Sequence, residues 1–127
     1  MPADCRVLIV DDHDYVRSGL RTLLEAEGGV SVVGEAENGV AAVEMADSLQ
    51  PHVVLMDYNM PQMNGLEATR QIKARQPGVQ IIGLSMHVEG VIKQEMLAAG
   101  AAAFHSKCDE LNQLLDTVRM LGSGLSP

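Results

Sequence analysis

The sequence predicts a single α/β domain in which a parallel sheet of five strands is covered by helices on both faces. Short apolar runs recur along the chain, and stretches with the apolar spacing of helices separate them. The runs are rich in Val, Ile and Leu and do not alternate with polar residues, as is typical of strands buried on both faces. The 127 residues suffice for one ordinary domain but not for two.

The first strand and helix are the most clearly marked. The run CRVLIV predicts a strand over Cys5–Val10, and apolar residues at helical spacing predict a helix over 15–24. Asp14 is expected to be the N-cap of this helix, and Gly28 and Gly29 are expected at its C-cap.

The remaining elements follow by the same two patterns. Strands are expected at Val30–Glu35, Val53–Asp57, Val79–Ser85 and Ala102–His105, and helices around 40–45 and 66–72 and over Val88–Ala99 and Asp109–Leu121. Pro51 and Pro77 fall in connections that follow helices, and Asp109 is a further expected N-cap. Right-handed crossovers leave few topologies for this alternation, and the natural choice is a flavodoxin-like, doubly wound sheet of order 2-1-3-4-5.

Three carboxylates are expected to meet at one edge of this sheet. Asp11 and Asp12 follow the first strand, Asp57 closes the third, and the order 2-1-3-4-5 places those strands side by side. The mutual repulsion of the carboxylates favours a bound cation, and hard oxygen ligands suit Mg²⁺. Taken alone, Asp11 and Asp12 are as well explained by a polar turn with a helix cap, and Asp57 by a carboxylate that merely ends a strand.

Ser85 and Lys107 are expected at the same edge, because each follows or closes a neighbouring strand. A carboxylate held at the mouth of a buried strand suits a nucleophile that forms an aspartyl phosphate, and an ammonium and a hydroxyl suit the phosphate oxygens. A Ser or a Lys at a strand end is usually only a solvated surface residue. The joint placement of the five residues therefore carries the prediction.

Four segments resemble the successive signatures of response-regulator receiver domains, which are CheY-like: DDHDYVRSGL, MDYNMPQMNG, LSMH and AGAAAFHSK. The resemblance spans nearly the whole chain. The segments are most similar to the NarL/FixJ (LuxR-type) subfamily, whose receivers precede a helix-turn-helix DNA-binding domain.

The resemblance implies roles for individual residues. Asp57 would be the phosphoacceptor, and Mg²⁺ would be held by Asp12 directly, by Asp11 largely through water, by Asp57 and by the backbone carbonyl of Asn59. Lys107 and Ser85 would bind the phosphoryl oxygens. The aromatic switch position would be occupied by Phe104, which would turn inward as Ser85 moves toward the phosphoryl group. The loop after Asp57 would be held by Met60 and Pro61, and Asn64 and Gly65 would shape the loop that opens the third helix.

The resemblance also implies partners and a regulatory function. A sensor histidine kinase would donate the phosphoryl group, the switched chain would act on an output such as transcription, and phosphorylation could drive a homodimer. Residues 1–121 would be the receiver, and 122–127 would begin a flexible linker or tail, with a DNA-binding domain missing from this chain. The chain would be no free-standing enzyme, although it would catalyse its own phosphorylation and, with Met86 crowding the approach of water, a slow dephosphorylation.

Two other functions compete with this interpretation. An aspartate-dependent phosphatase would need the pattern DxDx[TV], whereas Asp57 is followed by Tyr58, Asn59 and Met60. A pseudo-receiver would keep the fold as an interaction module without phosphorylation, and its usual sign, the loss of a site residue, is absent from the sequence.

Composition excludes several further classes. A formal charge of −8 opposes direct binding to nucleic acid or to an anionic membrane. The cysteines form no CxxC pair and the histidines show no HxxxH or HExxH spacing, so no zinc, transition-metal or redox motif is indicated. No leader or membrane-spanning pattern is present, so a cytoplasmic location is expected. Arg17 and Arg21, at helical spacing, are expected on a solvated helix face or at a partner contact.

Overall fold

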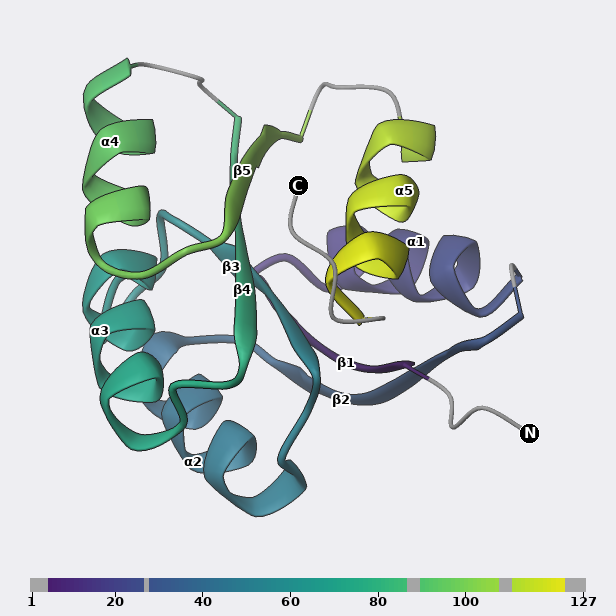
Figure 1. The fold of residues 1–127 in the computed structure, drawn as a ribbon, viewed down its shortest axis with the longest axis horizontal. Coiled ribbons are helices and arrows are strands. Elements are labelled where there is room, and N and C mark those ends of the chain that lie inside the picture. The colour runs from purple at the N-terminus through teal and green to yellow at the C-terminus, as the bar shows by residue number, and fades with distance from the viewer. Residues whose placement is uncertain (1–4, 27, 87–89, 108–110, 123–127) are drawn as a thin grey trace.

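The structure is a computed structural model that describes residues 5–26, 28–86, 90–107 and 111–122. Strands and helices alternate strictly along these residues, as Figure 1 shows. The strands are β1 (Cys5–Val10), β2 (Val30–Ala36), β3 (Val53–Asp57), β4 (Gln80–Ser85) and β5 (Ala103–Ser106). The helices are α1 (Asp14–Ala26), α2 (Gly39–Leu49), α3 (Gly65–Arg75), α4 (Gly90–Ala98) and α5 (Leu111–Gly122).

The sheet confirms the predicted topology. Its strands are all parallel and lie in the order β2-β1-β3-β4-β5. Helices α1 and α5 cover one face of the sheet, and α2, α3 and α4 cover the other (Figure 1). Because parallel strands all end at the same edge, every loop that follows a strand opens on one side of the molecule.

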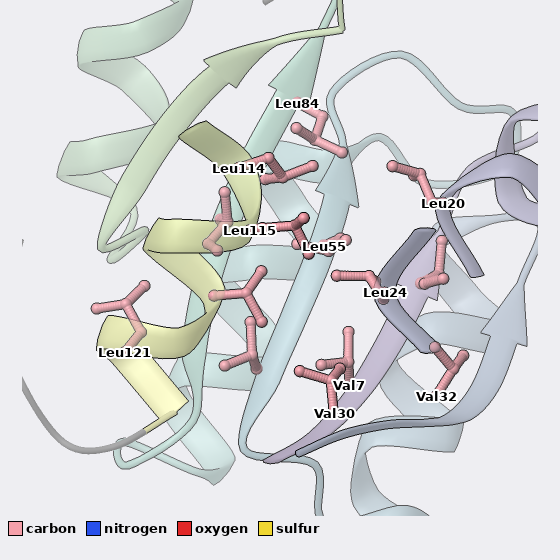
Figure 2. Close-up of a cluster of buried hydrophobic side chains, with 14 residues drawn as sticks. Val7, Leu20, Leu24, Val30, Val32, Leu55, Leu84, Leu114, Leu115 and Leu121 are labelled. Atoms are coloured by element: carbon pink, nitrogen blue, oxygen red, sulfur yellow. The ribbon is translucent and has the colours of Figure 1, made fainter. Parts of the chain in front are cut away.

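Two apolar clusters, one on each face, explain why the strands are apolar throughout. The cluster beneath α1 and α5 includes Leu24 and Leu115, which meet Leu55 from the middle of the sheet (Figure 2). The cluster beneath α2, α3 and α4 includes Ile72 and Met96. All five side chains are at most 2% exposed. Consecutive strand residues alternate between these clusters, so a strand here has no solvated face.

Several element boundaries differ from the predictions by one residue. Strand β5 begins and ends one residue late because its pairing with β4 runs on to Ser85 and Ser106. The prediction that Asp14 caps α1 was wrong: the amide of Arg17 donates to the carbonyl of His13, so His13 precedes the helix and Asp14 is its first residue. The predicted helix starts at Val88 and Asp109 lie outside the described residues.

Asparagine caps fix the two helices that pack beside the site. Asn38 accepts a hydrogen bond from the amide of Ala41 at 2.8 Å and begins α2, and Asn64 accepts from the amide of Glu67 at 3.0 Å and begins α3. In the described part of the chain, no helix combines the length and apolarity that a bilayer crossing requires.

Candidate functional site

Strand register brings the predicted site residues to one level at the carboxyl edge of the sheet. Val10 pairs with Met56, so Asp11 lies beside Asp57, and Asp57 itself pairs with Leu84. At the next pair of strands, Ser85 pairs with Ser106, which directly precedes Lys107. Two backbone hydrogen bonds continue this alignment past the strand ends, from Tyr58 to the carbonyl of Leu84 at 2.9 Å and from Lys107 to the carbonyl of Ser85 at 2.8 Å.

An ammonium joins two buried carboxylates at this edge. Lys107 Nζ lies 2.6 Å from Asp11 Oδ2 and 3.1 Å from Asp57 Oδ1. The side chains of Asp11 and Asp57 are 1% and 3% exposed, and that of Lys107 is 10% exposed. One positive charge thus faces two negative charges from which water is nearly excluded, which leaves a net negative charge in a region of low dielectric.

The ionisation of Asp57 reflects this imbalance. Burial, and then the charge of Asp11, raise the pKa of Asp57 from 3.8 to about 6, although Lys107 and the amide of Asn59 act in the opposite direction. The pKa of Lys107 is raised as well: burial lowers it, but the hydrogen bond to Asp11 and the charges of Asp57 and Asp11 outweigh burial. Lys107 therefore stays protonated, and above about pH 6 Asp57 is an ionised carboxylate in a desolvated position.

His13, to which the sequence patterns assign no role at the site, contacts both members of the acidic pair Asp11 and Asp12. His13 Nδ1 lies 3.1 Å from Asp11 Oδ1 and 3.1 Å from Asp12 Oδ1, and the donor atoms of these residues all lie within 4.8 Å of one another. Asp12 is more open to solvent than Asp11, with a side chain 30% exposed against 1%. HxxxH and HExxH spacings do not identify His13, because its neighbours here are carboxylates rather than a second histidine.

These donors fit a hard divalent cation. Carboxylate and carbonyl oxygens are the ligands that Mg²⁺ prefers, and a cation there would offset the charge that Lys107 leaves uncompensated. Among the predicted ligands, Asp11 and Asp12 lie in one group and Asp57 is linked to Asp11 through Lys107. Asn59 lies in the loop after Asp57, and its amide donates to Asp57 Oδ1 at 3.4 Å.

A glycine lets the loop after Asp57 fold closely over the end of β3. The amide of Gly65 donates to the carbonyl of Tyr58 at 2.9 Å. A Cβ at Gly65 would lie 2.1 Å from the carbonyl oxygen of Asp57, so only glycine fits without movement of the backbone. Met60 is half-buried in this loop and Pro61 is exposed.

Ser85 and Phe104 lie on neighbouring strands at the far side of the site. Ser85 is 1% exposed at the end of β4. Phe104 is half-buried on β5 and packs against the apolar cluster beneath α2, α3 and α4. Its ring lies so close over Gly83 that a Cβ there would meet Phe104 Cδ2 at 2.7 Å and Met96 Cε at 3.0 Å.

Comparison with known proteins identifies this arrangement. The profile of the response regulator receiver domain matches residues 7–119. The chain belongs to this family. It is 40% identical over 119 residues to the response regulator GacA of Pseudomonas protegens and 42% identical over 118 residues to the response regulator UvrY of Escherichia coli K12. These alignments cover 94% and 93% of the chain but 56% and 54% of the relatives, so the receiver spans about half the length of the curated proteins that it matches.

Solved receivers share the fold over almost the whole chain. The signal receiver domain of the response regulator NarL from Mycobacterium tuberculosis is 33% identical with a TM-score of 0.92, covering 97% of this chain and 99% of that one. The isolated REC domain of RcsB from Salmonella enterica serovar Typhimurium is 29% identical with a TM-score of 0.89, covering 98% and 92%. The predicted resemblance to receivers, and within them to the NarL/FixJ type, is confirmed by these relatives.

Proposed function

We propose that this receiver accepts a phosphoryl group on Asp57 from a phosphohistidine of a sensor histidine kinase. The observation that carries the proposal is the buried Asp57 carboxylate, which lies 3.1 Å from Lys107 and beside a second buried carboxylate. A nucleophile needs to be ionised and poorly solvated, and Asp57 meets both conditions above about pH 6. A kinase as the phosphodonor is consistent with the relatives, which are response regulators.

In the transfer step, an oxygen of the Asp57 carboxylate attacks the phosphorus in line with the bond to the histidine nitrogen. The new O–P bond forms as the N–P bond breaks, and the electron pair of the N–P bond returns to the imidazole, which then takes up a proton. Lys107, which already contacts Asp57 Oδ1, is placed to bind the oxygens of the incoming group as a point charge. Ser85 would donate its hydroxyl to the same oxygens.

The residues expected to hold Mg²⁺ are Asp11, Asp12, Asp57 and the backbone carbonyl of Asn59. When bound, the ion supplies positive charge that offsets the carboxylates and the transferred oxygens. Asp12 is suited to direct ligation because it is the more accessible member of the acidic pair, whereas Asp11 is buried and paired with Lys107.

Phosphorylation would be read out through Ser85 and Phe104. Movement of Ser85 toward the phosphoryl group would let the Phe104 ring settle deeper between β4 and α4, which shifts an existing equilibrium rather than creating a new state. The output would be transcription through a helix-turn-helix domain beyond this chain, in a cytoplasmic protein that dimerises on phosphorylation. The matched length of the relatives is consistent with such a second domain.

The test is an intact-mass measurement after incubation with Mg²⁺ and a small phosphodonor. The wild-type chain gains one phosphoryl group, Asp57→Asn gains none, and the exposed control Asp47→Asn behaves as wild type. EDTA prevents the gain. A wild type that gains no mass would mean a pseudo-receiver, and continuous turnover of phosphomonoesters would mean a phosphatase, so either result contradicts the proposal.

Replacement of Met86 tests the predicted slow loss of the phosphoryl group. Its side chain is 57% exposed at the end of β4, next to Ser85. If the thioether hinders the approach of water, Met86→Ala shortens the half-life of the phosphorylated chain. An unchanged half-life would remove Met86 from the explanation.

A further inference from the structure

The guanidinium of Arg17 ties three segments together behind the acidic pair. Its Nη1 donates to the backbone carbonyl of Asp11 at 2.5 Å, its Nε donates to Glu35 Oε1 at 3.2 Å, and its Nη2 pairs with Asp14. The Arg17 side chain is only 12% exposed. The expectation of a solvated Arg17 was therefore wrong, since three of its nitrogens contact oxygens from the link after β1, from β2 and from α1.

The carbonyl that Arg17 holds belongs to the peptide between the two acidic residues. Asp11, Asp12 and His13 form the short link between the end of β1 and the start of α1, where no ladder or helical hydrogen bond fixes the Asp11 carbonyl. Rotation of that peptide would move Asp12 relative to Asp11. A charged donor at 2.5 Å fixes the plane of the peptide and with it the direction in which Asp12 leaves the strand.

The contacts of Arg17, called the Arg17 brace below, include the end of β2. The amide of Asp11 donates to the carbonyl of Ala36 at 3.0 Å, and the residue before Ala36 is Glu35, the carboxylate partner of Arg17. Both polar atoms of the Asp11 backbone are thus anchored to the end of β2, one directly and one through Arg17. Arg21 pairs with the other carboxylate oxygen of Glu35, its Nη1 lying 2.6 Å from Oε2, and so does not occupy the oxygen that Arg17 uses.

We propose that Arg17 is a positioning residue for the cation site: it orients the Asp11–Asp12 peptide and thereby sets the affinity for Mg²⁺. This inference rests on the proposed function, because it assumes that the acidic pair binds the cation. Loss of a residue that orients a metal ligand typically weakens metal binding by about tenfold to a hundredfold.

Arg21 provides a matched control on the same helix. It shares the partner Glu35 but, among its contacts, reaches Glu25 and the carbonyl of Val32 rather than Asp11. If the ion pairs of α1 only stabilise the fold, Arg17→Gln and Arg21→Gln have similar effects on Mg²⁺ binding. If Arg17 positions the acidic pair, only Arg17→Gln weakens Mg²⁺ binding.

The experiment uses the folded 127-residue chain and its variants. Backbone amide chemical shifts give the Mg²⁺ dissociation constant, and phosphorylation rates at several Mg²⁺ concentrations give the concentration that half-saturates phosphorylation. Arg17→Gln is expected to raise both by about tenfold, while the phosphorylation rate at saturating Mg²⁺ changes less than threefold. Arg17→Lys, which keeps the charge but lacks the planar fork, recovers the loss only in part. Arg21→Gln stays within twofold of wild type.

The possible outcomes separate the two proposals. Equal Mg²⁺ affinity in wild type and Arg17→Gln overturns the positioning role but leaves phosphorylation of Asp57 intact, whereas a wild type without Mg²⁺ binding overturns both. Should Arg17→Gln fail to fold, Glu35→Gln tests the same brace, and an unchanged half-saturating Mg²⁺ concentration in that variant overturns the positioning role as well.

Discussion

The two ends of the sheet differ in how their polar groups are paired. At the amino end, polar groups pair with the backbone: the amide of Arg6 donates to His52 Nδ1 at 2.9 Å, and the amide of His52 donates to the carbonyl of Arg6 at 2.9 Å. At the carboxyl end, Asp11 and Asp57 are buried against a single lysine. These contacts at the first end involve no carboxylate, whereas the second end keeps an excess of buried negative charge.

This difference shows where the fold gives up stability for function. A buried carboxylate with a pKa raised to about 6 is less stable in its ionised form than in water, so Asp57 works against folding at neutral pH. The hydrogen bonds between Arg6 and His52 at the amino end involve no buried carboxylate. Replacement of Asp57 should therefore differ from a replacement at the amino end in sign, in pH dependence and in its response to Mg²⁺.

The largest effect is expected from Lys107→Met, which removes the only cation that the structure places between Asp11 and Asp57 among the described residues. The metal-free chain should lose about 3 kcal/mol of unfolding free energy at pH 7.5, because two buried carboxylates are left facing each other. Urea denaturation in EDTA measures the loss, and Mg²⁺ should restore part of it. Lys93→Met, on an exposed position of α4, should change little.

Asp57→Asn should change stability in the other direction. A folded-state pKa above the ordinary value means that the folded chain binds more protons between about pH 4 and pH 6, so the contribution of Asp57 to stability falls as pH rises through that window. The difference from 3.8 corresponds to about 3 kcal/mol, so without divalent cations Asp57→Asn should be more stable than wild type by up to about that amount at pH 7.5.

The two curves should converge below about pH 4, where Asp57 is protonated in both the folded and the unfolded chain and Asn is no longer an advantage. Urea denaturation at several pH values gives the comparison. Asp47→Asn, at an exposed site on α2, controls for the loss of one negative charge. A wild-type chain as stable as Asp57→Asn at pH 7.5 would show that Lys107 fully compensates both carboxylates.

Gly65→Ala tests whether the loop over Asp57 is as tightly closed as its geometry indicates. The added methyl group would lie 2.1 Å from the Asp57 carbonyl oxygen, so the backbone must shift, at a cost of about 2 kcal/mol. Phosphorylation should slow as well, since the same loop carries Asn59. Gly78→Ala is the matched control, because nothing lies within 4 Å of its Cβ position. Equal stabilities of the two variants would contradict the close approach.

The carboxyl end was also the part that the sequence predicted best. Apolar runs place the strands, and the order of parallel strands follows from crossover rules, so the convergence of Asp11, Asp57 and Lys107 could be predicted without coordinates. The contacts of Arg17 and His13 could not. Helical spacing places Arg17 on α1, but its partner Glu35 lies 18 residues away on another strand, and only the tertiary structure shows that the two meet.

The same reasoning explains the small errors at element ends. Asp14 is a good capping residue, yet the start of α1 is set by the turn that His13 makes beside Asp11, which local propensity does not contain. Gly65 likewise follows the cap residue Asn64, but the need for glycine there comes from the Asp57 carbonyl oxygen, which would lie 2.1 Å from a Cβ and which the local sequence pattern does not contain.

The smallest effect is expected at the amino end, from His52→Ala. The side chain is exposed, and its loss removes one hydrogen bond from the amide of Arg6, which corresponds to about 1 kcal/mol. His52→Asn, which can present an acceptor near the same place, should recover much of that loss. Neither variant should alter Mg²⁺ affinity or phosphorylation, because no charge at the site changes. A shift in the half-saturating Mg²⁺ concentration would show instead that the two ends of the sheet are coupled.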